Sequence, residues 1–509
     1  MKFKIIDFVK KNKVEIIILG LVLLIGAFCR LYKISEYMTF LGDEGRDVII
    51  VRRIFTELHP PLIGPGTSVG MMYLGPLYYY MMAIPLLISG FSPVGPAVMV
   101  ALLGVATIAF IWWAGRTWFG RSTGLIAAGL YAISPTIITF SHSSWNPDIM
   151  PFFALLSMYS VWKVWRQRKL NWLIVLGISF AFVLQSHYLG LLLVPTLFIF
   201  WLSTLVDLKK NGRVKPFVKK SLMGLGCFLF LMSPLLIFDL RHNFMNSRAL
   251  YQFILERDTT ISGSPWQALP KLPSVFNLIN SSLLVGKNAL AGIISSVFVA
   301  GGIIYLFVRN FIKHKNFRIK GEYILLLSWI AFGLFGLALY KQSIYDHYLG
   351  FLFPVPFFLV AIFLSKLLKD GKITKTLAVV GIVCLIVLNL FQNPFRFGPN
   401  RQLQRAKDVS AEILTLSGGK PFNLAVIAER NYEDGYRYFL ELWGGKVLHA
   451  DRWDPSTISD TLFVVCENDP AKCDPARSPK AEVANFGMSV IKGEWNVDGV
   501  IIYKLAHAQ

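Results

Sequence analysis

Charged side chains are scarce in this sequence. Asp, Glu, Lys and Arg together make up 16% of its 509 residues, against about a quarter of a typical soluble domain. Hydrophobic residues make up 54%, and they gather in runs of roughly 20 residues, long enough to cross a hydrocarbon core of about 30 Å. A soluble protein is therefore excluded, and the sequence predicts an α-helical polytopic membrane protein.

Acidic residues are the rarer charged class. The sequence has 30 Asp and Glu against 51 Lys and Arg, which gives a net charge of +21. In a soluble protein this excess would indicate a nucleic-acid partner. Here the Lys and Arg lie in short loops between apolar runs, where they set the topology and contact anionic lipid. We therefore expect membrane lipid as a partner and no nucleic acid.

Nucleotide-binding motifs are missing, and cysteine is rare. The sequence has neither a phosphate-binding loop with its lysine nor a Gly-x-Gly-x-x-Gly after a strand. Of five cysteines, Cys29, Cys227 and Cys384 lie in apolar runs, which is typical of packing residues. Cys466 and Cys473 lie in the polar C-terminal part, where either a disulfide or two free thiols remain possible.

The segment 73–90 decides the predicted topology. The basic tail of residues 1–13 predicts a cytoplasmic N-terminus, since Lys and Arg are enriched on that side. If 73–90 does not cross, most Lys and Arg of the later loops also fall on the cytoplasmic side. We therefore expect 73–90, which contains Pro76 and Pro85, to be a re-entrant or juxtamembrane segment of a first outer loop, residues 34–93.

This topology divides the chain into a membrane part, residues 1–392, and an outer domain, residues 393–509. We expect about eleven membrane helices and an extracytoplasmic C-terminus. The predicted spans are 14–31, 94–115, 123–140, 149–165, 171–187, 189–206, 221–238, 288–308, 322–340, 349–367 and 375–391. In the outer domain, a helical pattern over Tyr432–Leu442 and strand patterns over Thr461–Val465 and Val500–Tyr503 predict a small α/β fold.

An acidic pair, Asp43-Glu44, follows the first span almost at once. It begins an amphipathic stretch, Asp43–Leu58, which predicts a helix in the membrane interface that ends before Pro60. Charged groups beside lipid are costly, so they mark functional sites by default. The alternative is that these acids only cap the helix N-terminus, where negative charge is favoured.

Four further connections bring polar side chains to the same predicted side of the membrane. They are 141–148, 185–188, 239–242 and 341–348. The centres of the predicted spans are nearly free of charge, whereas a transporter would place such groups near the bilayer centre. We therefore expect an active site on the outer face, built from several loops.

Carboxylates, cations and aromatic side chains beside lipid suit sugar transfer from a lipid-linked donor. A carboxylate can take the proton of an acceptor hydroxyl as that hydroxyl attacks the anomeric carbon. Cations and histidines can stabilise the departing phosphate, where negative charge develops. We therefore expect a polyprenyl-phosphate-linked monosaccharide as one partner, and an acceptor glycan, lipid or protein as the other.

Three features together resemble the GT-C glycosyltransferases. They are Asp43-Glu44 after the first span, Pro76 before a tyrosine cluster, and the loop Asn146-Pro147-Asp148. Within that group the sequence is similar to the protein O-mannosyltransferases and the lipid A aminoarabinose transferases, over roughly residues 14–365. The resemblance implies a GT-C fold, an inverting glycosyl transfer and a place in the plasma membrane.

The resemblance implies that Asp43 is the catalytic base and that Arg46 contacts the donor phosphate, and the polar and aromatic residues at the outer ends of the spans complete the expected site. The expected catalytic residues are Asp43 as the base, with Glu44 and Asp148 supporting it. The expected donor-phosphate contacts are Arg46, His187, His347 and Lys341. The expected donor or acceptor contacts are Tyr73, Tyr78, Tyr79, Tyr188, Tyr345, Tyr348, Trp145 and Asn146.

One position departs from the pattern of the similar families. The aminoarabinose branch tends to have Lys before the proline of the tyrosine-rich segment, where this chain has Gly75. A second phosphate-binding cation is therefore left to His187, His347 or Lys341. The three acids could together hold a divalent cation, but similar families manage without one, so we expect no metal and no other cofactor.

The sequence leaves two other classes of function open. A transporter or flippase of lipid-linked sugars would show alternating access to the two sides of the membrane. A sensor would bind glycan through the domain 393–509 and use the spans only as a scaffold.

Overall fold

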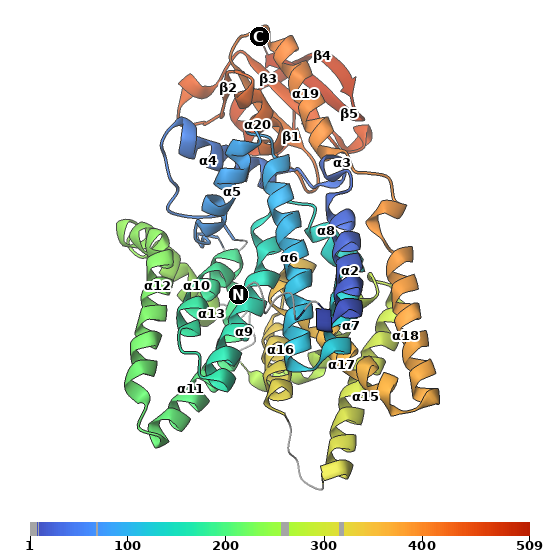
Figure 1. Ribbon diagram of the computed structural model, residues 1–509. Helices are drawn as coiled ribbons and strands as arrows, with labels where there is room; N and C mark the ends of the chain where they lie inside the picture. Colours follow the sequence, from blue (N-terminus) through green and yellow to red (C-terminus); the bar gives the residue numbers. More distant parts are fainter. Residues whose placement is uncertain (1–7, 9, 68–69, 256–263, 315–319, 509) are drawn as a thin grey trace.

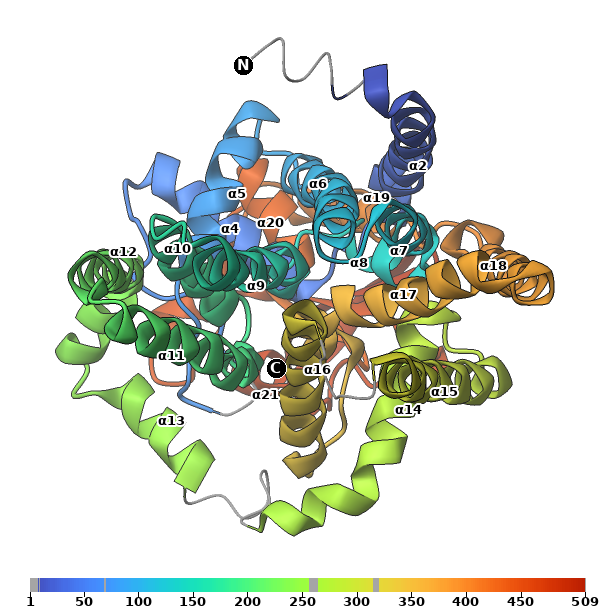
Figure 2. The same cartoon turned by 60° about the horizontal axis from the view of Figure 1, so that its bottom comes forward.

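The computed structural model describes residues 8, 10–67, 70–255, 264–314 and 320–508. Figure 1 shows a bundle of long helices with a helix-and-sheet domain, coloured orange to red, resting on one end. Figure 2 turns the other end of the bundle toward the viewer and shows the helix ends side by side. Residues 1–7 of the predicted basic tail lie outside the described part of the chain.

Seven helices among the described residues are long and apolar enough to cross a membrane. They are α2 (Lys13–Leu31), α6 (Val94–Trp118), η2 with α11 (Tyr188–Lys210), α12 (Val214–Arg241), α15 (Ala289–His314), α16 (Gly321–Leu339) and α18 (Lys372–Phe391). An eighth candidate is a pair, η4 (Asp346–Leu352) and α17 (Pro354–Asp370), bent by 58°. The bend coincides with Pro354, whose ring cannot continue the helical hydrogen bonds of the preceding turn.

All eleven predicted spans fall on helical segments, but three are not among these candidates. Segment 123–140 is divided into α7 (Arg121–Ile133) and α8 (Pro135–Phe140), because a proline follows Ser134. The other two segments correspond to η1 (Asn146–Ile149) with α9 (Met150–Gln167), and to α10 (Trp172–Ser186), which is 15 residues long. The predicted fold class, a helical polytopic membrane protein with a small C-terminal sheet domain, is confirmed.

Residues 34–93, the predicted first outer loop, form three short helices, α3 (Ile34–Tyr37), α4 (Gly42–Thr56) and α5 (Leu77–Ile88). The predicted helix over Asp43–Leu58 is confirmed as α4, and its place in the membrane interface stays a prediction. Helix α5 has 12 residues and is therefore about 18 Å long, too short for a 30 Å hydrocarbon core. This agrees with the prediction that 73–90 does not cross the membrane.

Three further helical segments link the later spans. They are α13 (Met245–Leu255), η3 (Pro265–Lys271) and α14 (Leu272–Leu284). Asp239 at the end of α12 accepts hydrogen bonds from the backbone N–H groups of Asn246 and Ser247, and so caps the start of α13. This cap fixes the direction in which the chain leaves α12.

The C-terminal domain contains a five-stranded sheet in the order β2-β1-β3-β5-β4. Its elements are α19 (Gln402–Ser417), β1 (Phe422–Ile427), α20 (Asp434–Leu442), β2 (Val447–Leu448), β3 (Thr461–Cys466), α21 (Ala481–Phe486), β4 (Ser489–Val497) and β5 (Val500–His507). Strands β2, β1 and β3 run parallel, and β5 and β4 are added antiparallel. The predicted helix and both predicted strands are therefore confirmed.

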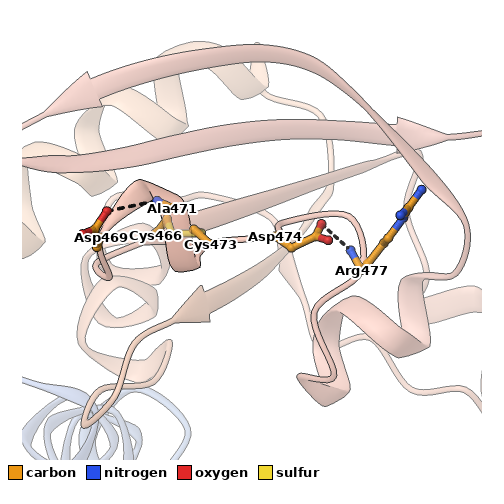
Figure 3. Close-up of a disulfide and its surroundings, with 6 residues drawn as sticks. All are labelled: Cys466, Asp469, Ala471, Cys473, Asp474 and Arg477. Carbon is orange, nitrogen blue, oxygen red and sulfur yellow. Dashed lines mark hydrogen bonds between the residues drawn. A yellow bond between two sulfur atoms is a disulfide. The ribbon is translucent and has the colours of Figure 1, made fainter.

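Cys466 and Cys473 form a disulfide, which decides between the two possibilities that the sequence left open. Figure 3 shows the bond at the end of β3, beside a short loop in which Asp469 accepts a hydrogen bond from the backbone N–H of Ala471. The disulfide closes this loop immediately after the carboxyl end of a central parallel strand.

One buried apolar cluster joins the domain to the juxtamembrane helices. Its members include Val48 and Val51 of α4, Tyr79 and Met82 of α5, Ala97 of α6, Leu403 and Ala406 of α19, Phe422 of β1, and Tyr438 and Phe439 of α20. The cluster is continuous from the bundle into the domain, so the domain is packed against α4 and α5. This contact brings the carboxyl ends of β1 and β3 to the start of α4.

Candidate active site

A cavity of about 440 Å³ lies at the end of the bundle that carries the C-terminal domain. Its polar lining includes Asp43, Arg46, Trp145, Asn146, His187, Tyr188, His347 and Tyr348. Its apolar lining includes Leu189, Leu191, Leu192, Leu250, Phe253 and Leu339. These residues come from α4, η1, η2, α13, α16 and η4, so several connections build one site, as the sequence predicted.

Asp43 and Arg46 lie three residues apart on the first turns of α4, so their side chains face each other. Arg46 Nη1 donates a hydrogen bond to Asp43 Oδ1 at 2.8 Å. The Asp43 side chain is 46% exposed, toward the cavity that it lines. A carboxylate and a guanidinium therefore sit together at the cavity wall.

Asp47, which the sequence analysis did not select, holds Arg46 from the other side. Its buried Oδ1 accepts from Arg46 Nε at 3.0 Å and from Nη2 at 2.8 Å. It also accepts from the Tyr79 hydroxyl at 2.8 Å. Burial raises the pKa of Asp47 to about 6, so the side chain is ionised at neutral pH. Asp47 thus orients the guanidinium, and Tyr79 acts on the site through Asp47.

Glu44 and Asp148 do not line the cavity. Glu44 is buried, and so are both carboxylate oxygens of Asp148. Glu44 Oε2 accepts a hydrogen bond from the backbone N–H of Leu41 at 3.0 Å, at the start of α4. Burial raises the pKa of Glu44 to about 7. Burial, with Glu44 nearby, raises the pKa of Asp148 well above its ordinary value. Glu44 therefore titrates near neutral pH, and burial favours the protonated form of both carboxyls.

Glu44→Gln is expected to gain stability over wild type as pH rises from about 4.5 to about 7. The pKa of Glu44 rises from 4.5 to about 7 on folding, so in this window the folded state keeps a proton that the unfolded state has lost. The free energy of unfolding of wild type therefore falls across this window, by at most about 3 kcal/mol. That of Glu44→Gln does not fall for this reason, because the Gln side chain does not ionise. Thermal unfolding in detergent at a series of pH values measures the difference.

The matched control for this experiment is Glu57→Gln, at the exposed end of the same helix. Its melting temperature should follow that of wild type across the pH series. A constant offset between Glu44→Gln and wild type at every pH would contradict the expected titration of Glu44.

His187 is a neutral hydrogen-bond donor in this site. Its Nδ1 accepts from the backbone N–H of Leu189 at 3.2 Å, so the ring proton is on Nε2. Burial lowers the pKa of His187 to about 3. A role of His187 as a second cation for the donor phosphate would require Nδ1 to be protonated and this bond to break, and it stays a prediction.

Aromatic rings surround the histidines of the cavity. His347 packs against Trp145 with ring centroids 4.5 Å apart and stacks on Tyr345 at 5.8 Å. Tyr348 lies 4.8 Å from His187. These rings offer flat apolar faces beside polar edges, a combination that suits a sugar ring. Asn146 is fixed at the same wall, since its Nδ2 donates to the Ser186 carbonyl at 2.7 Å.

Hydrogen bonds of Tyr73 and Tyr188 hold together the segments that surround the cavity. The Tyr188 hydroxyl donates to the Tyr73 carbonyl at 2.6 Å and accepts from Asn246 Nδ2 at 3.2 Å. Asn246 Oδ1 in turn accepts from the Tyr73 backbone N–H at 2.6 Å. This closed set of hydrogen bonds ties the first outer loop to η2 and to the start of α13.

The structure does not bring every predicted residue into the cavity wall. Tyr78 and Tyr79 are buried; the Tyr78 hydroxyl lies 2.7 Å from Ser144 Oγ. Lys341 and Tyr345 are exposed and lie beside the cavity-lining residues Tyr340 and His347. Arg46 is the basic residue that lines this cavity in the described part of the chain.

Gly75, where the similar families tend to have Lys, lies against Gln185. A Cβ atom at position 75 would lie 2.1 Å from Gln185 Oε1. That oxygen accepts from the Leu77 backbone N–H at 3.1 Å, and Gln185 Nε2 donates to the Leu231 carbonyl at 2.9 Å. The amide of Gln185 therefore occupies the space in which a lysine side chain at this position would begin.

In the described part of the chain, no group of three or more His, Cys, Asp or Glu side chains is arranged to hold a metal ion. Asp43, Glu44 and Asp148 therefore do not form such a group here. The expectation that the protein needs no metal stays a prediction.

Comparison of the sequence with known families gives a partial match. The family described as dolichyl-phosphate-mannose-protein mannosyltransferase matches residues 74–238, about a third of the chain. YkcB of Bacillus subtilis (strain 168), which carries a mannosyltransferase name, is 24% identical over 199 residues. That alignment covers 38% of this chain and 27% of YkcB, so the chain matches about a quarter of that relative's length.

Two solved structures resemble the whole arrangement. ArnT from Cupriavidus metallidurans, solved with undecaprenyl phosphate, gives a TM-score of 0.59 at 12% identity and covers 97% of this chain and 98% of ArnT. The archaeal oligosaccharyltransferase AglB from Archaeoglobus fulgidus, solved with an inhibitory peptide and a dolichol-phosphate, gives 0.52 at 13% identity, over 89% of this chain and 69% of AglB. At these identities the likeness concerns the fold.

Proposed function

Since the chain has the GT-C fold of membrane glycosyltransferases, we propose that it transfers a monosaccharide from a polyprenyl-phosphate donor to an acceptor hydroxyl or amine. The observation that carries the proposal is the pairing of Asp43 with Arg46 at the wall of a cavity whose other lining residues are mainly aromatic and apolar. The transfer needs a base for the acceptor proton and a cation for the leaving phosphate. An apolar wall suits an isoprenoid chain.

Asp43 is the proposed base. The two hydrogen bonds that it accepts from Arg46 and Tyr432 both end on Oδ1. Within the described residues, Oδ2 is thus the oxygen placed to take the acceptor proton. The acceptor oxygen then forms a bond to the anomeric carbon while the bond from that carbon to the phosphate oxygen breaks. Attack from the side opposite the phosphate inverts the anomeric configuration.

Arg46 and His187 are the proposed contacts of the leaving phosphate. A guanidinium has five N–H groups, and the contacts to Asp43, Asp47 and Tyr432 use four. The remaining Nη2 N–H of Arg46 and the Nε2–H of His187 can donate hydrogen bonds to the phosphate. The positive charge of Arg46 stabilises the negative charge that develops there. One cation with neutral donors suits a monophosphate diester, which carries a single negative charge.

We place this site at the outer face of the plasma membrane, with the N-terminus in the cytoplasm. The distribution of basic residues supports this orientation. Lys163, Arg166, Lys209 and Lys210 lie at helix ends of α9 and α11, away from the end that carries the C-terminal domain. Lys and Arg favour the cytoplasmic side, so the cavity and the domain face outward.

The test is donor consumption by the purified protein in lipid. A panel of radiolabelled polyprenyl-phosphate monosaccharides would be offered with and without candidate acceptors, and both sugar transfer and donor hydrolysis would be counted. Consumption of one donor supports the proposal. Movement of intact donor across vesicles without consumption would instead support a flippase and overturn the proposal.

A further inference from the structure

A side chain of the C-terminal domain reaches the proposed base. The Tyr432 hydroxyl donates a hydrogen bond to Asp43 Oδ1 at 2.7 Å and accepts one from Arg46 Nη1 at 3.2 Å. Burial raises the pKa of Tyr432, so the phenol keeps its proton and remains a donor to the carboxylate. Tyr432 is 389 residues from Asp43 in sequence and belongs to the loop between β1 and α20.

The loop that carries Tyr432 is fitted closely to the start of α4. The side chain of Asn431 accepts from the backbone N–H of Gly42 at 2.9 Å, and so caps α4 from another domain. A Cβ atom at Gly42 would lie 2.5 Å from the Tyr432 ring. A Cβ atom at Gly45 would lie 2.3 Å from the Asp434 backbone. The two glycines of α4 therefore allow the loop to approach.

The carboxyl end of β3 supports the same loop. Glu467, next to the disulfide-bonded Cys466, accepts from Asn431 Nδ2 at 2.6 Å and from the Tyr436 hydroxyl at 2.5 Å. Asn431 is thereby held by two partners at once, one in each domain. The position of Tyr432 is fixed by this hydrogen bonding as well as by its own two contacts.

We propose that Tyr432 is a positioning residue for Asp43, so that the C-terminal domain forms part of the catalytic unit. This inference rests on the proposed function. The Tyr432 hydroxyl engages Oδ1, holds the carboxylate plane and keeps Arg46 next to the base. Its loss would leave Arg46 held by Asp47, but it would leave the Asp43 carboxylate with only the hydrogen bond from Arg46, so the carboxylate would be freer to rotate.

The experiment compares Tyr432→Phe in two backgrounds, wild type and Asp43→Asn, using the donor that wild type consumes. Phe keeps the ring against Gly42 and removes only the hydroxyl. In the wild-type background we expect kcat to fall about 10-fold or more, as for a lost hydrogen bond to a charged group. In the Asp43→Asn background we expect little further loss, because Tyr432 acts through Asp43.

Tyr438→Phe is the matched control. Tyr438 also lies where the domain meets the bundle, and its hydroxyl donates to the Phe91 carbonyl, away from the cavity lining. This variant should keep the wild-type kcat. Thermal unfolding of each variant establishes that equal amounts of folded protein are compared.

Each other outcome has a definite meaning. An equal loss from Tyr432→Phe in both backgrounds, or a similar loss in Tyr438→Phe, shows a role in docking only and overturns the inference. A Tyr432→Phe variant whose kcat stays within about twofold of the wild-type value also overturns the inference. If wild type consumes none of the donors, the proposed function falls and the inference falls with it.

Discussion

Asp43→Asn is expected to lower sugar transfer by about 10²-fold or more, the usual contribution of a general base. The amide keeps the shape of the side chain and can still accept from Arg46 and Tyr432, but it cannot take the acceptor proton. Because the base acts only in the transition state, kcat should fall while the donor KM changes little. Initial rates at several donor concentrations measure both constants.

Glu57→Gln is the control for this variant, because it removes a carboxylate at the exposed end of the same helix. It should retain the wild-type rate. An Asp43→Asn protein with a normal rate would leave the fold assignment intact and would show that another group takes the proton. Glu44 and Asp148, the two other expected acids, would then be tested next, since Asp43 acts on the pKa of Glu44 and Glu44 acts on that of Asp148.

Arg46→Lys is expected to lower transfer by about 10²-fold, the loss typical of removing a donor from a developing oxyanion. Lys keeps the charge, but a single ammonium cannot reproduce the fork that contacts Asp43, Asp47 and Tyr432 together. The donor KM should rise as kcat falls, because Arg46 contacts the phosphate before and during the reaction. Rates and the binding of unlabelled polyprenyl phosphate measure the two effects.

Arg52→Lys is the control for Arg46→Lys. Arg52 lies on the same helix and pairs with Glu441 of the C-terminal domain, outside the cavity lining. A comparable loss of activity in Arg52→Lys would show that any change in the basic residues of α4 disturbs the docked domain. That result would contradict a specific role of Arg46 at the phosphate.

Local spacing in the sequence was enough to predict that Asp43 and Arg46 lie together in the candidate site. Asp43 and Arg46 share one face of one helix, so a three-residue spacing places them together. The membrane helices and α4 were predictable for the same reason, since their apolar patterns are continuous in sequence. Strand β4 was not predicted, because its burial pattern is mostly exposed and gives no buried periodic face.

Other parts of the site depend on contacts that no local pattern contains. The contact of Tyr432 with Asp43 is set by how a whole domain packs on α4. The protonation of His187 depends on the backbone N–H that faces its Nδ1. Asp47 was visible in the charged motif, but a sequence does not reveal that its carboxylate is buried between Arg46 and Tyr79.

The long separation between Asp43 and Tyr432 has a consequence for biosynthesis. Helix α4 leaves the ribosome early, with the first span, whereas the loop that contacts it belongs to the last quarter of the chain. A chain still being made therefore holds Asp43 without its contact to Tyr432. The candidate site is complete only when the C-terminal domain has been made and has packed on α4.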